Sequence, residues 1–133
     1  MKIQKDKLEN IRKKYNLLLI LLHGSQVEGK IHDKSDIDIA VVRKNSKQKL
    51  RLLKIIKDLS GALNSNKVDV SDLTHADPLF LYLAVRKTKL LSGRKGDYDQ
   101  LLRLAFHKYN DYKPYLKMES EFVRERIKSY VTT

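Results

Sequence analysis

The sequence contains no cysteine, has only two prolines, and has no apolar run long enough to cross a membrane. Without cysteine the chain cannot form disulfides, thiolate metal sites or a cysteine nucleophile, and this absence suits a reducing cytosol. The longest apolar run, residues 17–22, is far shorter than the ~20 residues of a spanning helix. Residues 1–14 are too charged for the apolar stretch of a signal peptide. We therefore expect a soluble, cytoplasmic protein with no membrane partner.

Acidic residues are scarce relative to basic ones, with 16 Asp and Glu against 28 Lys and Arg, which gives a net charge of +12. Such an excess is expected for an anionic partner, such as nucleotide phosphates, nucleic acid or an acidic protein face. It is equally expected for a lysine-rich surface that only faces water. No recognisable nucleic-acid motif accompanies the charge, so nucleic acid is not expected as a direct substrate.

The spacing of apolar residues predicts a mixed order of helices and strands. Strands are expected over residues 17–22, 36–42 and 67–72, and helices over 3–14, 47–63, 77–87, 97–112 and 115–130. Ser46, Asp77 and Asp97 are predicted N-caps, and Pro114 should break or kink the last helical region. Leu90 and Leu91 form a short apolar stretch before a turn. The helix over 47–63 should bury one face, made of Leu50, Leu53, Ile56, Leu59 and Leu63.

This order predicts an α/β (α+β) fold, with a small mixed β-sheet flanked by helices and a C-terminal helical arm. A chain of 133 residues has the usual size of one domain. We expect one domain over residues 1–133, with a core over about 1–96 and the arm over about 97–133.

Two aspartates alternate with isoleucines at the start of the second predicted strand. Side chains alternate faces along a strand, so Ile37 and Ile39 should enter the core while Asp36 and Asp38 share the opposite face, roughly 7 Å apart. Two adjacent carboxylates repel each other unless a cation lies between them. Carboxylate oxygens are ligands that Mg²⁺ accepts together with substrate phosphates.

The third predicted strand repeats this pattern, because Val68 and Val70 should face the core and Asp69 the other side. If the two strands are neighbours, Asp69 completes a cluster of three carboxylates with Asp36 and Asp38. Such a cluster can hold two metal ions about 4 Å apart for in-line phosphoryl chemistry.

Gly24 and Ser25 follow the first predicted strand directly. Glycine lets the backbone come close to a ligand, and the serine hydroxyl and the amides after it can bind phosphate oxygens. Each feature alone is commonplace, because a Gly-Ser pair is usually an ordinary turn and an Asp-x-Asp is usually only solvated. Their combination at this spacing favours a phosphate and metal site.

The stretch Gly24-Ser25, ten residues, then Asp36-Ile37-Asp38 resembles the signature of the DNA polymerase β-type nucleotidyltransferase superfamily. The size is similar to its minimal members. The likeness continues through residues 68–73, 76–78 and 89–91, and residues 109–112 resemble the tail of minimal nucleotidyltransferase antitoxins. Those antitoxins are partners of HEPN-domain ribonuclease toxins. The resemblance covers about residues 17–130.

This resemblance implies a nucleotidyltransferase fold and specific roles for several residues. Asp36, Asp38 and Asp69 would bind Mg²⁺, and Asp69 would alternatively help to deprotonate the acceptor. The nucleotide, ATP, would be bound by Gly24, Ser25, Lys30 and Ser35. Similar antitoxins transfer AMP from ATP to a tyrosine of the HEPN toxin, which neutralises it, and they can form an assembly with that toxin.

Two positions depart from the family pattern. His23 stands where an aromatic residue is common, and Glu28 stands where arginine is common, although Lys30 offers a compensating charge. These departures motivate a second hypothesis, an antitoxin that neutralises its toxin by binding alone. A third hypothesis, ranked last, is a nucleic-acid binder, motivated by the charge of +12. Within the enzyme class, a small-molecule acceptor is an alternative, although the chain has no obvious second domain to form that pocket. His23 itself could contact a phosphate or be an ordinary core or loop histidine.

Overall fold

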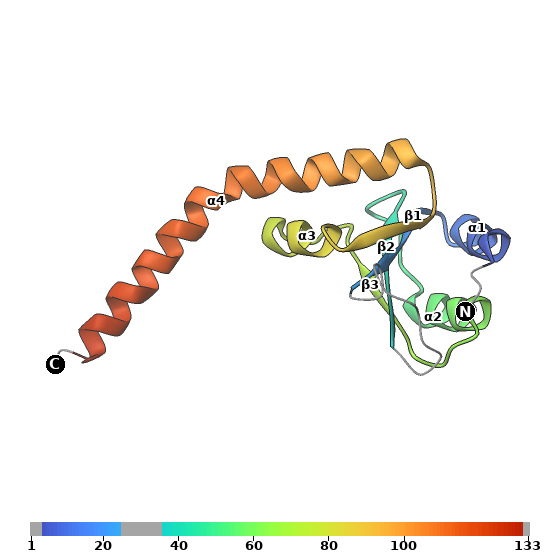
Figure 1. Ribbon diagram of the computed structural model, residues 1–133, viewed down its shortest axis with the longest axis horizontal. Helices are drawn as coiled ribbons and strands as arrows, with labels where there is room; N and C mark the ends of the chain where they lie inside the picture. The colour runs from blue at the N-terminus through green and yellow to red at the C-terminus, as the bar shows by residue number, and fades with distance from the viewer. Residues whose placement is uncertain (1–3, 25–35, 132–133) are drawn as a thin grey trace.

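The computed structural model describes residues 4–24 and 36–131, which form a mixed sheet with helices on both faces and a long final helix (Figure 1). In chain order the elements are α1 (Lys5–Lys14), β1 (Leu17–His23), β2 (Ile37–Arg43), α2 (Leu52–Leu63), β3 (Val68–Asp72), α3 (Pro78–Val85), β4 (Thr88–Ser92) and α4 (Lys95–Val131). The predicted fold class is confirmed. Within these ranges, no helix is long and apolar enough to cross a membrane.

The strands lie in the order β3-β2-β1-β4. β1 pairs antiparallel with both β2 and β4, whereas β2 pairs parallel with β3. A parallel pair needs a long crossover connection, and α2 supplies it between β2 and β3. The parallel pairing matters for the site, because it brings the starts of β2 and β3 to the same end of the sheet.

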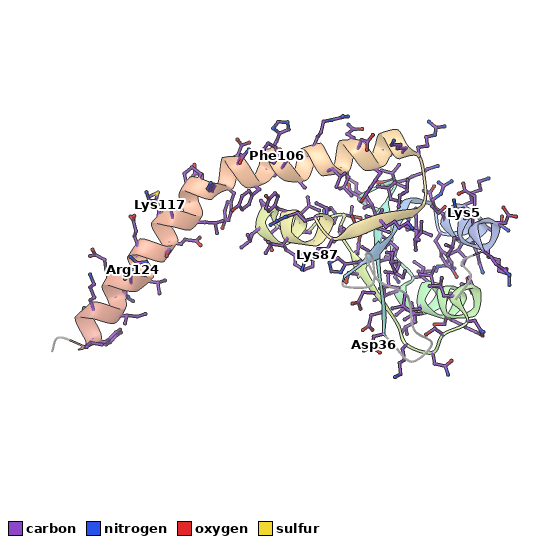
Figure 2. All side chains as sticks on the ribbon, in the orientation of Figure 1. Lys5, Asp36, Lys87, Phe106, Lys117 and Arg124 are labelled. Atoms are coloured by element: carbon purple, nitrogen blue, oxygen red, sulfur yellow. The ribbon has the colours of Figure 1, made fainter. Side chains whose placement is uncertain are left out.

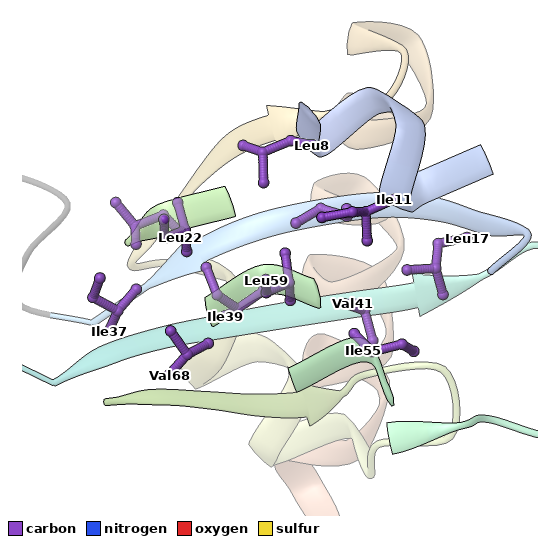
Figure 3. Packing of buried hydrophobic residues seen from close by; sticks show 12 residues of the cluster. Leu8, Ile11, Leu17, Leu22, Ile37, Ile39, Val41, Ile55, Leu59 and Val68 are labelled. Carbon is purple, nitrogen blue, oxygen red and sulfur yellow. The ribbon is translucent and has the colours of Figure 1, made fainter. Parts of the chain in front are cut away.

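One face of the sheet is covered by α1 and α2 (Figure 3). Leu8 of α1 and Ile55 and Leu59 of α2 pack there, fully buried, against the isoleucines of β2. Burial of each such side chain contributes about 1.5–3 kcal/mol. This face therefore provides the rigid support from which β2 presents its other side chains.

The other face is covered by α3 and the first turns of α4. Its buried cluster contains Leu19 and Leu21 of β1, Ala40 and Val42 of β2, and Ala105 of α4. Tyr98, Leu101 and Leu102 of α4 pack against it. This cover reaches only part of the sheet, and the acidic starts of β2 and β3 remain exposed beyond it.

The predicted cap Ser46 and part of the predicted α2 face are wrong, and one strand was not predicted. Ser46 does not cap a helix, because α2 begins at Leu52 with Arg51 as N-cap, and the Ser46 carbonyl instead accepts a hydrogen bond from His75 Nε2 at 2.9 Å. The buried face of α2 is Ile55, Leu59 and Leu63, whereas Leu53 is 82% exposed. Leu90 and Leu91 belong to a fourth strand, β4.

The C-terminal region is one helix rather than two. α4 runs through Pro114, and Figure 1 shows the helix bent near its middle. It begins at Lys95, so Asp97 lies in its first turn and does not cap it. By contrast, the predicted N-cap of α3 is confirmed, because the Asp77 carboxylate accepts a hydrogen bond from the Phe80 amide at 2.9 Å.

Candidate active site

A row of polar side chains crosses the sheet where β1 ends and β2 and β3 begin. In the strand registers, Asp69 lies opposite Asp38, Asp38 opposite His23, and His23 opposite Thr88. Residues directly opposite each other on neighbouring strands project from the same face. The four strands therefore present Asp69, Asp38, His23 and Thr88 side by side on one face.

Alternation along each strand decides which face this is. Ile37 and Ile39 enter the cluster under α1 and α2, so Asp38 points to the face that carries α3 and α4. Val68 is likewise buried in that first cluster, so Asp69 points with Asp38. Both aspartates are exposed, because α3 and α4 cover only the part of this face that lies farther from the starts of β2 and β3.

Asp36 lies just before β2, exposed and two residues from Asp38. Figure 2 places it at the opposite end of the sheet from the start of α4. Among residues 4–24 and 36–131, no three Asp, Glu, His or Cys side chains are placed to hold a metal ion. The parallel register brings Asp38 and Asp69 together, whereas the three-carboxylate cluster with Asp36 stays a prediction.

Gly24 follows β1 directly and lies beside Asp38. Its φ is +100°, a conformation that glycine adopts without strain, and an added Cβ would lie 3.4 Å from Asp38 Oδ2. The Gly24 amide donates a hydrogen bond to the Lys87 carbonyl at 3.0 Å, which fixes the end of β1 to the turn before β4. A ligand can therefore approach the backbone beside the Asp38 carboxylate.

The remaining predicted nucleotide-binding residues, Ser25, Lys30 and Ser35, lie outside the described residues, as does Glu28. His23, for which the sequence leaves open a phosphate contact or an ordinary core or loop position, has a specific place in the structure. It is the last residue of β1, half-buried, and it adjoins Asp38 in the row. The alternation Leu19, Leu21, His23 indicates only the face on which His23 lies, since both leucines face the side of the carboxylates.

Several acidic residues elsewhere in the described chain have structural partners. Asp72, at the far end of β3, forms an ion pair with Arg43 at 2.9 Å. Hydrogen bonds from the Ser92 hydroxyl and then from Arg12 lower the pKa of Glu9. The Tyr15 hydroxyl and Lys14 lower the pKa of Asp58 in the same way. These contacts join helices and strands, in contrast to the exposed carboxylates of the row.

A mixed sheet of this topology, with acidic side chains in register on two parallel strands and a glycine at the end of β1, defines a nucleotidyltransferase fold. The model of the polymerase beta nucleotidyltransferase family matches residues 6–97 of the chain. The chain therefore belongs to this family.

Two protein adenylyltransferases are similar to part of the chain. The protein adenylyltransferase MntA of Shewanella oneidensis is 36% identical over 81 residues, which are 61% of this chain and 58% of that protein. The protein adenylyltransferase MntA of Aphanizomenon flos-aquae is 30% identical over 90 residues, 61% of this chain and 60% of that protein. The chain thus matches less than two thirds of the length of either relative.

A solved structure is similar over nearly the whole chain. The crystal structure of a toxin–antitoxin with AMP-PNP superposes with a TM-score of 0.69 at 26% identity, covering 93% of this chain and 98% of that one. The similarity includes α4, because 93% coverage cannot be reached from residues 6–97 alone.

Proposed function

We propose that this chain is a cytoplasmic protein adenylyltransferase that transfers AMP from ATP to a hydroxyl, most simply a tyrosine, of a HEPN ribonuclease toxin and so neutralises it. The observation that carries the proposal is the register that places Asp38 beside Asp69, next to Gly24. The relatives named as protein adenylyltransferases and the toxin–antitoxin structure with AMP-PNP support the choice of nucleotide and partner.

Asp36, Asp38 and Asp69 are the residues that would hold Mg²⁺, because their donor set consists only of carboxylate oxygens. The bound metal would neutralise the triphosphate and polarise the α-phosphate. Gly24 leaves room for the phosphates beside Asp38, and Ser25, Lys30 and Ser35 would complete their binding. We place His23 at the same surface, where its ring would contact the bound nucleotide.

The reaction that this arrangement supports is an in-line displacement. The acceptor oxygen forms a bond to the α-phosphorus while the bond to the bridging oxygen breaks, and pyrophosphate leaves. The proton of the acceptor hydroxyl passes to a base. Asp69, which lies opposite Asp38 in the strand register, would alternatively take that role instead of binding the metal.

Replacing Asp36 and Asp38 together by asparagine should abolish labelling of the toxin by radioactive ATP, with a loss of at least about a thousandfold. Asparagine keeps the shape but removes the charge that would bind the metal. Asp6→Asn, on the exposed surface of α1, is the matched control and should label normally. Normal labelling by the double variant would show that the site lies elsewhere.

A second candidate, neutralisation by binding alone, is favoured by one specific observation. The distal half of α4 exposes Tyr115, Met118, Phe122, Val123, Ile127 and Tyr130, each more than half exposed. Large exposed apolar side chains of this kind are typical of a protein-binding surface. If the Asp36→Asn, Asp38→Asn chain still inactivates the toxin without labelling it, contact alone neutralises the toxin.

A further inference from the structure

A cavity of about 400 Å³ lies between the end of α1 and the segment that leads into α2. Its walls include Lys14, Tyr15 and Asn16 on one side and Lys49, Arg51 and Lys54 on the other. α1 and α2 cover the face of the sheet opposite to the Asp38 and Asp69 side chains. The cavity is therefore separate from the candidate active site.

The lining of this cavity carries charge of one sign. Four of its side chains are cationic and none is acidic. Lys14 pairs with Asp58 at 3.0 Å, whereas Lys49, Arg51 and Lys54 have no ion pair within the part of the chain that the structure describes. A concave surface lined by unneutralised charge of one sign concentrates its field and attracts counter-ions.

Hydrogen bonds fix the two walls of this cavity relative to each other. The Gln48 side-chain amide donates to the Tyr15 carbonyl at 2.9 Å and its oxygen accepts from Asn16 Nδ2 at 3.2 Å. The Lys44 amide donates to the Asn16 carbonyl at 3.2 Å. These contacts fix the segment before α2 against the end of α1.

The start of α2 adds to the positive potential of this cavity. Its N-cap Arg51 provides no side-chain hydrogen bond, and its first turn contains no acidic residue. The first amides of a helix have no partner within the helix and carry a partial positive charge. Arg51 and Lys54, three residues apart, project from the same side of this turn into the cavity.

We propose that this cavity binds the phosphate groups of a small oligophosphate anion, independently of the candidate active site and without a metal ion. Its volume lies in the range of small-molecule sites, and lysine and arginine form charge-assisted hydrogen bonds with phosphate oxygens. The Tyr15 hydroxyl already donates to Asp58 at 2.5 Å. Recognition therefore rests on the phosphates, and inorganic triphosphate and ATP should bind with similar affinity.

The test is isothermal titration of the whole chain with inorganic triphosphate, in EDTA and at low salt. The variant K49E/R51E/K54E should bind at least about tenfold more weakly than the wild type. The control K108E/K113E/K117E changes the net charge equally on exposed positions of α4 and should bind like the wild type. Circular dichroism checks that both variants are folded. The variant K49Q/R51Q/K54Q, which removes the three charges without reversing them, should lose less affinity for triphosphate than K49E/R51E/K54E.

Three results would overturn the proposal. Equal weakening in both charge-reversal variants would assign the binding to net charge alone. Loss of binding in the Asp36→Asn, Asp38→Asn chain would place the anion at the carboxylate row. A single-stranded oligonucleotide that binds far tighter than triphosphate, through the same three cations, would identify a nucleic-acid backbone as the ligand. None of these results depends on whether the chain transfers AMP.

Discussion

Among the glycines that the structure describes, Gly93 leaves the least room for a side chain. Its φ is +131°, and an added Cβ would lie 2.7 Å from Leu19 Cδ2 and 2.8 Å from the Leu18 carbonyl oxygen. A side chain at this position would strain the backbone and push β4 away from β1. We expect Gly93→Ala to lower the free energy of unfolding by about 2–3 kcal/mol, measured by urea denaturation.

Gly61 provides the control for this prediction. It lies inside α2, and an added Cβ there would meet no atom within 4 Å. Gly61→Ala should therefore raise the free energy of unfolding by about 0.5–1 kcal/mol, because alanine restricts the unfolded chain and favours helix. Equal effects of the two substitutions would contradict the geometry described for Gly93.

At the scale of elements, two hydrogen bonds to Asp58 of α2 join it to the end of α1. The Tyr15 hydroxyl donates to Asp58 Oδ2 at 2.5 Å, and Lys14 Nζ donates to the same oxygen at 3.0 Å. The hydrogen bond from Tyr15 lowers the pKa of the Asp58 carboxyl most, and the hydrogen bond from Lys14 lowers it further. A carboxyl whose pKa is lowered by folding stabilises the folded state at pH values above its unfolded pKa of about 3.9. This stabilisation is lost as the pH falls below that value.

We therefore expect Tyr15→Phe to reduce the free energy of unfolding at pH 7 by about 1 kcal/mol. The difference from the wild type should shrink as the pH falls below about 4, because Asp58 then becomes protonated in both proteins. Tyr112→Phe removes a similar hydroxyl whose contact with exposed Glu119 is long, at 3.5 Å, and should have almost no effect. A difference that is constant from pH 3 to pH 7 would show that the Asp58 charge is not involved.

The elements that the sequence predicted well are those with one clear periodicity. Ile37 and Ile39 alternate with aspartates, and β2 follows directly from that pattern. The face of α2 was assigned wrongly because Leu53, Ile56 and Leu59 follow three-residue steps, while Ile55, Leu59 and Leu63 follow four-residue steps, and both spacings are helical. Hydrogen bonds from Gln48 and Arg43 hold the preceding segment as a loop, and this tertiary contact decides where the helix begins.

The candidate site, too, could be predicted only in part from the sequence. Alternation was sufficient to place Asp38 and Asp69 on one face, because a valine or isoleucine flanks each of them on both sides. The register between strands was not available from the sequence, so His23 could not be placed beside Asp38. β4 was missed because only two apolar residues in Thr88–Ser92 indicate a strand, and its pairing with β1 supplies the rest.

At the scale of the whole molecule, α4 has two parts with different surroundings. Up to Tyr109 it packs on the body, where Tyr109 stacks on Tyr82 of α3 with ring centroids 4.0 Å apart. Residues 113–131, the distal arm, extend away from the sheet (Figure 1) and are almost all exposed. Figure 2 shows Lys117 and Arg124 on this projecting segment.

A helix of this length without tertiary packing is marginally stable in water. We therefore expect the amides of the distal arm in the free chain to exchange with deuterium at less than about tenfold protection, measured by mass spectrometry. Residues 98–109 belong to the same helix and serve as the internal control. Their amides should be strongly protected, because Tyr98, Leu101, Leu102 and Ala105 are packed against the sheet.

Adding the proposed HEPN toxin partner should then protect the distal arm at least about tenfold, because burial of its apolar side chains would stabilise the helix. Phe122→Ser with Ile127→Ser should abolish this protection, whereas Lys117→Ser with Arg124→Ser, on the same arm, should leave it nearly unchanged. Strong protection of the arm in the free chain would contradict this view. Unchanged exchange with the toxin bound would place the partner surface on the body, around the row from Asp69 to Thr88.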